Sequence, residues 1–127
     1  MFRIKNLFPI SLSICLFFQF QCLSQAAASS KTYYVDGAAA PNGDGSFSNP
    51  FQTMNQGTAS AQAGDTVNVR AGTYPELIVF PQGGNSETER IILKAYASEI
   101  VIVSNAGRCL DVDQPYITVE NIIFWVA

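Results

Sequence analysis

Short runs of β-prone residues fill most of the chain after Gly64. These runs are residues 66–69, 77–80, 91–95, 100–103, 109–112, 116–119 and 122–125. Turn-forming residues separate many of them, at 71–72, 83–85, 105–107 and 114–115. Many short strands divided by turns predict an all-β domain, which is either a two-layer sandwich or a solenoid of stacked coils.

The spacing of similar runs favours the solenoid. Val67 precedes Ile92 by 25 residues, Ile78 precedes Val101 by 23, and Val101 precedes Ile123 by 22. This interval fits one coil of a parallel β-helix, whose coils stack about 4.8 Å apart. No two runs are joined by a two-residue Asn-Gly or Asp-Gly turn, the usual connection of a β-hairpin. A sandwich remains the alternative, and the continuous apolar runs do not reveal which side chains point inward.

The segment before these runs combines a strand, a loop and a helix. Residues 32–35 are β-prone, and residues 36–50 are rich in Gly, Asn, Asp, Ser and Pro, which predicts a loop. Residues 51–63 have a helical pattern, with Asn49 as the expected N-cap and Pro50 at the first helical position. The residues expected on one helix face are Phe51, Met54, Thr58 and Ala61.

Residues 1–28 have the features of a secretory signal peptide. Arg3 and Lys5 give a positive start, residues 7–20 are mostly apolar, and residues 26–28 are the small side chains that a signal peptidase needs. We therefore expect export to the periplasm or the extracellular medium. The apolar run is shorter than the roughly 20 residues of a membrane span, so no stable span is expected after removal of the signal.

A lipoprotein signal ending at Cys22 is the alternative for this segment, because a cysteine follows the apolar run. Gln19 and Gln21 stand where such a signal has small or apolar residues, so the sequence argues against this alternative.

The composition excludes several kinds of chemistry. The chain contains no histidine, so it has neither a histidine general base nor a histidine-ligated zinc site. Residues 29–127 carry five Lys and Arg against ten Asp and Glu, which gives 5 − 10 = −5. A nucleic-acid partner is not expected at this charge, because no basic stripe would meet the phosphates. Cys109 is the only cysteine after residue 28, and we expect it to be a small buried side chain.

Four segments resemble the amino-terminal end of right-handed parallel β-helix proteins. They are TYYVDG at 32–37, DGSFSNPFQT at 44–53, AQAGDTVNVRAGTY at 61–74 and YITVENIIF at 116–124. This superfamily includes pectate-lyase-like, chondroitinase B-like and alginate-lyase-like secreted enzymes, and the resemblance covers residues 31–124. It implies that residues 29–64 form a strand, a loop and a capping helix, and that residues 65–127 form the first coils.

The resemblance also implies a function. It predicts the N-terminal part of a secreted carbohydrate-active protein, most plausibly a polysaccharide lyase that acts on an acidic polysaccharide. The alternative is a non-catalytic β-solenoid scaffold or adhesin. The superfamily's catalytic groove lies on middle coils, and no residue here matches a catalytic motif, so catalytic and substrate-binding residues stay unassigned. A chain that stops after two to three coils is expected to be inactive alone and to self-associate through its open C-terminal edge.

Two sets of charged residues are candidates for site chemistry. Asp111, Asp113 and Glu120 could contribute oxygens to a calcium site, the cofactor that the resemblance allows, although no complete ligand set is present. A solvated position beside a turn is the simpler interpretation. The cationic candidates are Arg90, Lys94 and Arg108, which could neutralise a uronate carboxylate during β-elimination. Solubilising charges on an outer face are the simpler interpretation of these three.

Aromatic and glycine-rich segments complete the candidates. The exposed faces of tyrosines could stack on sugars, although packing within the fold is the more ordinary role. These tyrosines are Tyr33, Tyr34, Tyr74 and Tyr116. Residues 42–45, Asn-Gly-Asp-Gly, partly match the spacing of a calcium loop but lack its distal glutamate, so we expect a turn.

Overall fold

The structure is a computed structural model that describes residues 29–126, so the predicted signal peptide and the Cys22 alternative lie outside the described residues. The described elements, in chain order, are β1 (Thr32–Val35), α2 (Met54–Ser60), β2 (Thr66–Val69), β3 (Gly72–Tyr74), β4 (Ile78–Val79), β5 (Ile91–Ala95), β6 (Val101–Asn105), β7 (Leu110–Asp111), β8 (Ile117–Glu120) and β9 (Ile123–Val126). Among residues 29–126, no helix is long and apolar enough to cross a membrane.

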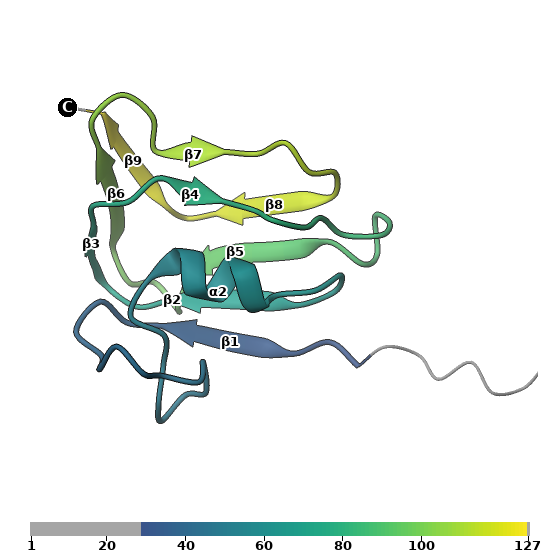
Figure 1. Ribbon diagram of the computed structural model, residues 1–127, viewed down its shortest axis with the longest axis horizontal. Helices are drawn as coiled ribbons and strands as arrows, with labels where there is room; N and C mark the ends of the chain where they lie inside the picture. The colour runs from purple at the N-terminus through teal and green to yellow at the C-terminus, as the bar shows by residue number, and fades with distance from the viewer. Residues whose placement is uncertain (1–28, 127) are drawn as a thin grey trace, which may run out of the picture.

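The strands form three parallel sheets that are the walls of a solenoid. Sheet A has the order β1-β2-β5-β8, sheet B has β3-β6-β9, and sheet C has β4-β7. Every strand pair is parallel, so each wall gains one strand per turn of the chain. Figure 1 shows the coils stacked from β1 at the bottom to β7, β8 and β9 at the top. This is the predicted parallel β-helix, and the sandwich alternative is wrong.

The register differs from the spacing that the sequence suggested. Val67 lies opposite Leu93, 26 residues later, whereas Ile78 lies opposite Leu110 on sheet C, 32 residues later. The predicted equivalence of Ile78 and Val101 is therefore wrong. The reason is that residues 72–74, in part read as a turn, form β3, which pairs with β6 and gives each coil a third wall.

The register also settles which side chains fill the interior. On β5 the fully or almost fully buried residues are Ile91, Leu93 and Ala95, and on β2 they are Val67 and Val69. Alternate residues of the continuous apolar runs thus point inward and stack in columns from coil to coil. The buried core consists of Val35, Met54, Ala61, Val67, Val69, Tyr74, Ile78, Phe80, Ile91, Leu93, Ala95, Val101, Val103 and Cys109.

Helix α2 begins later than the sequence predicted. Thr53 is its N-cap, and the Gln56 side chain reaches back to the Thr53 backbone in a capping box. The expected start at Phe51 with Asn49 as cap is wrong, because Phe51 is extended and its N–H donates to the Tyr34 carbonyl. The expected inner face is correct at its three later positions, all fully buried: Met54, Thr58 and Ala61.

The loop after β1 closes the lower edge of sheet A. The Tyr34 N–H donates to the Gly45 carbonyl at 2.8 Å, and the Phe51 N–H donates to the Tyr34 carbonyl at 2.9 Å. The Phe51 carbonyl in turn accepts from the Asp36 N–H at 2.8 Å. The outward backbone groups of Tyr34 and the N–H of Asp36, at the β1 edge of sheet A, are therefore bonded within the chain.

Helix α2 closes the lower edge of sheet C, at the same end of the solenoid as β1. In Figure 1 the helix lies in front of sheet A and below β4, where a further strand of sheet C would otherwise lie. The Asn55 and Thr58 side chains form hydrogen bonds with the backbone of β4. The helix thus has the predicted capping role.

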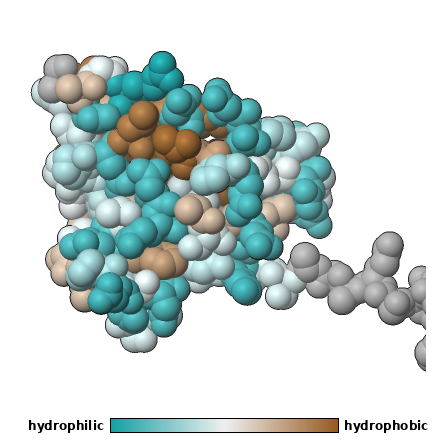
Figure 2. All heavy atoms as spheres, in the orientation of Figure 1, coloured by the Kyte–Doolittle hydropathy of each residue, from teal (hydrophilic) through white to brown (hydrophobic). Residues whose placement is uncertain are grey.

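The opposite end of the solenoid is less covered. Among residues 29–126, strands β7, β8 and β9 each pair with a neighbour on one side only. The inward-facing Phe124 is 38% exposed, whereas its partner in the coil below, Val103, is fully buried. Figure 2 also shows apolar atoms gathered over β4 and β7, where Val79 and Val112 are each 42% exposed.

Candidate functional site

The outer face of sheet A carries rows of polar and aromatic side chains. Because Val67 and Val69 point inward on β2, Asn68 and Arg70 point outward. The parallel register places these outward residues beside those of the neighbouring strands. The middle row consists of Tyr34, Asn68, Lys94 and Glu120.

An aromatic cluster of Tyr34, Phe47 and Tyr96 lies on this wall. Phe47 belongs to the loop after β1. The ring centroids of Tyr34 and Phe47 are 5.2 Å apart in an edge-to-face arrangement, and those of Tyr34 and Tyr96 are 5.9 Å apart. Phe47 and Tyr96 are 6.2 Å apart. Phe47 is 58% exposed, so the cluster presents an aromatic face to solvent.

An ion pair borders the aromatic cluster. The Arg70 guanidinium carbon lies 5.1 Å from the centre of the Tyr96 ring, and Arg70 Nε lies 3.1 Å from Glu99 Oε2. The same Glu99 oxygen accepts from the Ala71 N–H. These contacts lower the pKa of Glu99, first through the Ala71 N–H and then through Arg70, and they raise the pKa of Arg70 through Glu99. Both groups therefore stay charged beside the rings.

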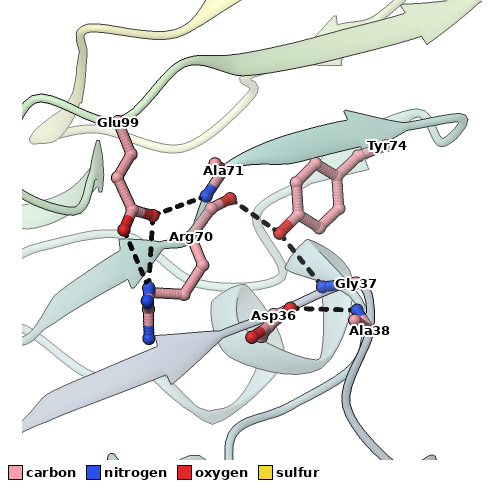
Figure 3. Close-up of polar contacts among 7 residues, drawn as sticks. All are labelled: Asp36, Gly37, Ala38, Arg70, Ala71, Tyr74 and Glu99. Atoms are coloured by element: carbon pink, nitrogen blue, oxygen red, sulfur yellow. Dashed lines mark hydrogen bonds and ion pairs between the residues drawn. The ribbon is translucent and has the colours of Figure 1, made fainter.

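A buried tyrosine fixes the backbone behind this ion pair, as Figure 3 shows. The Tyr74 hydroxyl donates to the Arg70 carbonyl at 2.9 Å and accepts from the Gly37 N–H at 3.1 Å. Burial raises the pKa of the Tyr74 hydroxyl. The two hydrogen bonds join the corner after β2 to the loop after β1, and so hold Arg70 and the loop that contains Phe47 in a fixed relation.

The exposed aromatic face has a defined chemical character. It offers a flat apolar surface, bordered by the charged Arg70 and Glu99 and by the amide of Asn68, which lies beside Tyr34 in the middle row. Such a surface suits a ligand with an apolar ring face and polar groups at its rim. It contains neither a nucleophile paired with a base nor a convergent set of carboxylates.

The acidic candidates do not come together. Asp111 lies on sheet C and its carboxylate accepts from Arg108 at 3.0 Å, whereas Glu120 lies on the outer face of sheet A. Asp113 is exposed. Across residues 29–126, no group of three or more Asp, Glu, Cys or His side chains could hold a metal ion. The calcium hypothesis for these residues therefore finds no assembled ligand set.

The cationic candidates divide between two walls. Arg90 and Lys94 share the outer face of sheet A, as their spacing predicted. The Arg90 guanidinium donates to the Thr118 hydroxyl at 2.7 Å and to the Ile117 carbonyl at 2.8 Å. Arg108 instead pairs with Asp111 beside sheet C, so it does not join the other two cations on one face. The physical reason is again the third wall, which places residue 108 on a different side of the coil.

The tyrosine candidates have different environments. Tyr33 packs against Phe51, with ring centroids 5.9 Å apart, and Tyr74 is buried. Packing is therefore the role of these two residues. Tyr34 belongs to the outer aromatic cluster, and Tyr116 is exposed near the last coil.

The remaining two candidates are structural. In the segment 42–45, the Asp44 carboxylate accepts from the Ser46 N–H at 2.9 Å, and its hydrogen bonds with Ser46 lower its pKa. This is the expected turn. Cys109 is buried, as predicted, with its sulfur 3.5 Å from the Trp125 carbonyl.

Two hollows lie where β1 begins. A broad, shallow depression of about 460 Å³ is lined by Lys31, Thr32, Tyr33, Asp44, Gly45 and Ser46. A smaller cavity of about 70 Å³ is lined by Ser29, Lys31, Tyr33, Gln62, Ala63 and Asp65. Neither is lined by residues of the outer aromatic cluster.

Sequence reasoning missed most of the aromatic cluster. Phe47, Arg70, Tyr96 and Glu99 were not among the candidates, although Arg70 lies in the quoted segment 61–74. The alternation in residues 66–70 was the available signal for the outward position of Arg70. It places Asn68 and Arg70 on one face of the strand, and Val67 and Val69 on the other. The approach of Phe47 had no such signal, since a loop residue follows no period.

Comparison with known proteins finds solved structures that share the fold over part of their length. No protein-family model matches the chain, and no curated protein matches it. The structure titled "The complex structure of XylC with xylose" is 34% identical, has a TM-score of 0.56, and matches 57% of this chain and 11% of that chain.

A second solved structure shows the same fold at lower identity. The GH136 lacto-N-biosidase from Eubacterium ramulus, as a selenomethionine derivative, is 17% identical with a TM-score of 0.67. That match covers 76% of this chain and 20% of the enzyme's chain. The native form of the same enzyme gives 18% identity and a TM-score of 0.60. The chain thus spans only about a tenth to a fifth of the length of the structures it resembles.

Proposed function

We propose that this chain is the N-terminal part of a secreted carbohydrate-active β-helix protein, and that the outer face of sheet A contacts a polysaccharide. The observation that carries the proposal is the exposed aromatic face of Phe47 with Tyr34 and Tyr96 on a parallel β-helix wall. A pyranose ring has an apolar face and a hydroxyl rim, which matches an aromatic surface bordered by Arg70 and Glu99. The titles of the similar structures, which name a xylose complex and a lacto-N-biosidase, support a carbohydrate ligand.

The proposed activity of the whole protein is that of a polysaccharide lyase on an acidic polymer. Lys94 lies in the same outward row as Asn68 and Glu120, where its ammonium could meet a uronate carboxylate. Arg70 is already paired with Glu99, so it contributes orientation more than net charge. The catalytic base and acid are proposed to lie outside this chain, which alone binds sugar without cleaving it.

A non-catalytic scaffold or adhesin is the second candidate. The observation that favours it is the division of Arg90, Lys94 and Arg108 between two walls, with Arg108 in an ion pair. On this alternative the aromatic cluster binds sugar or another surface, and no cleavage follows in any longer form of the protein.

Binding is tested with the full chain, expressed with its own leader and purified from the compartment that it reaches. Xylo-oligosaccharides and oligogalacturonates are titrated separately, and binding is measured by calorimetry and by shifts of the aromatic NMR signals. We expect binding that Phe47→Ala and Tyr96→Ala weaken at least tenfold. Tyr116→Ala, which removes an exposed aromatic side chain away from the cluster, is the matched control.

Two results would overturn parts of the proposal. Absence of binding to either sugar series, or binding that Phe47→Ala leaves unchanged, removes the aromatic cluster as the contact surface. Release of unsaturated uronate products by this chain alone contradicts the placement of the catalytic groups elsewhere.

A further inference from the structure

The loop that carries Phe47 has a neck closed by backbone hydrogen bonds. The Asn49 carbonyl accepts from the Asp44 N–H at 3.0 Å and from the Gly45 N–H at 3.1 Å. The Tyr34 N–H donates to the Gly45 carbonyl, so this neck is bonded to β1, and the loop lies below β1 in Figure 1. The position of Phe47 against the Tyr34 ring therefore depends on the main chain just before and just after the neck.

Asn42 and Gly43 lie directly before this neck. Glycine is required at residue 43, because a Cβ there would overlap the Pro50 carbonyl oxygen. Asn42 is exposed and Gly43 is partly exposed. Within residues 29–126, the Gly43 N–H donates a hydrogen bond to no other group of the chain. The glycine that the neck requires thus leaves an unprotected backbone nitrogen next to the Asn42 side chain.

The other asparagines after residue 28 lack this combination. Residues 29–127 contain seven asparagines, of which Asn42 alone precedes a glycine. Asn49 precedes Pro50, which has no N–H, and the remaining five precede residues whose Cβ shields the backbone nitrogen. Asn85 is the best comparison, because it is also exposed in a loop but precedes Ser86.

We propose that Asn42 is a site of spontaneous deamidation, which converts it to aspartate and isoaspartate. The Gly43 nitrogen loses its proton to a base from the solvent and attacks the side-chain carbonyl carbon of Asn42, which forms the new N–C bond of a five-membered succinimide ring. The side-chain nitrogen takes up a proton and leaves as ammonia when its C–N bond breaks. Water then adds to either ring carbonyl, and the ring opens to aspartate or isoaspartate. The net reaction consumes one water and releases one ammonia, with no oxidation or reduction.

Isoaspartate at residue 42 changes the geometry before the neck. Its main chain runs through the former side chain and gains one carbon–carbon bond of about 1.5 Å. Both neighbours of residue 42 are held in place, since the Pro41 carbonyl accepts from the Gln56 side chain at 3.4 Å and Gly43 lies against the Pro50 carbonyl. We therefore expect the loop to shift and the aromatic cluster to lose its edge-to-face contact.

Incubation of the full chain at mildly alkaline and at mildly acidic pH tests the site. The chain is digested under acidic conditions, and its peptides are analysed by mass spectrometry and with an isoaspartate-specific methyltransferase. We expect alkaline incubation to convert Asn42 at least tenfold faster than Asn85, the internal control, because only Asn42 has a glycine nitrogen beside it. Acidic incubation is expected to slow the reaction at Asn42, because the attacking nitrogen must lose its proton.

The variant Asn42→Gln is expected to stay intact on the same timescale, since its longer side chain would have to close a six-membered ring. An Asn42 that stays intact in the parent chain overturns the proposal. Equal rates at Asn42 and Asn85 overturn it as well.

The effect on the loop is measured by NMR, from the nuclear Overhauser contacts between the Phe47 and Tyr34 rings. Freshly prepared Asn42→Asp is the matched control, because it adds the negative charge without lengthening the main chain. We expect the contacts to weaken in the purified isoaspartate form and to persist in Asn42→Asp. Persistence in both forms overturns the loop shift, and equal weakening in both overturns its assignment to the longer main chain. No sugar enters these measurements, so their outcome is separate from that of the proposed function.

Discussion

Asn55 on helix α2 acts toward Val79 on β4 as a neighbouring strand would. The Asn55 side-chain carbonyl accepts from the Val79 N–H at 2.9 Å, and its amide donates to the Leu77 carbonyl at 2.8 Å. One side chain thus satisfies both a donor and an acceptor of a strand edge, and Thr58 adds a third bond to the Val79 carbonyl at 2.7 Å. This contact explains how a short helix can close a sheet.

Removing this amide should destabilise the fold. We expect Asn55→Ala to lower the free energy of unfolding by about 2 kcal/mol, because the Val79 N–H and the Leu77 carbonyl lose their partners. Urea denaturation followed by circular dichroism measures the change. Ala59→Ser, on the exposed side of the same helix, is the control, and equal stability of the two variants would contradict the role of Asn55.

Gly45 should be less replaceable than Gly107, although both have positive φ angles of 83° and 92°. A Cβ at Gly45 would lie 2.4 Å from the Phe51 ring and 2.8 Å from the Tyr33 ring, whereas a Cβ at Gly107 meets nothing within 4 Å. Alanine at either position is strained at a positive φ, which lowers the stability of both variants by about 1 kcal/mol. Gly45→Ala should cost about 1–3 kcal/mol more through overpacking.

Thermal and urea unfolding of the two glycine variants give the comparison directly. Equal losses of stability would show that the loop can shift to accommodate a Cβ at Gly45. The packing of Gly45 against Tyr33 and Phe51 would then not be what holds the loop to sheet A.

Acid should weaken the Arg70–Glu99 contact. The pKa of Glu99 is held below its ordinary value of 4.5 in the folded chain. The Glu99 carboxylate therefore takes up a proton less readily in the folded state than in the unfolded state. The stabilisation is therefore present above pH 4.5 and is lost as the pH falls through the lowered pKa. We expect Glu99→Gln to reduce stability at neutral pH and to flatten its decline in acid.

The measurement is the urea midpoint between pH 7 and pH 3, for the parent chain and for Glu99→Gln. Glu89→Gln, at an exposed glutamate, should keep the parent's profile. Parallel profiles for the parent and Glu99→Gln would show that the contact contributes nothing to stability.

The Tyr74 hydroxyl should stabilise the corner that carries Arg70. Tyr74→Phe keeps the buried ring but removes the bonds to the Arg70 carbonyl and the Gly37 N–H. We expect a loss of about 1–2 kcal/mol. Faster amide exchange at Gly37 than in the parent chain would locate the effect, and unchanged exchange would contradict it.

The sequence determined the elements that depend on local patterns. The β-prone runs predicted most of the strands, and residues 91–95 form β5 with the predicted bounds, because alternation and turn residues act over a few positions. The parallel β-helix was predicted from spacing and resemblance, and the buried face of the helix from its period. Cys109 was correctly expected to be buried.

Only the tertiary structure decided the walls and the candidate site. The strand at residues 72–74 begins with a glycine that reads as a turn, and only its pairing with β6 makes it a strand. Phe47 lies in a loop, whereas Arg70 and Tyr96 directly follow β2 and β5, and the three meet because the coil returns each segment to the same wall. Local propensity determines whether a segment can be a strand, but which distant segments become neighbours depends on the register of the whole coil.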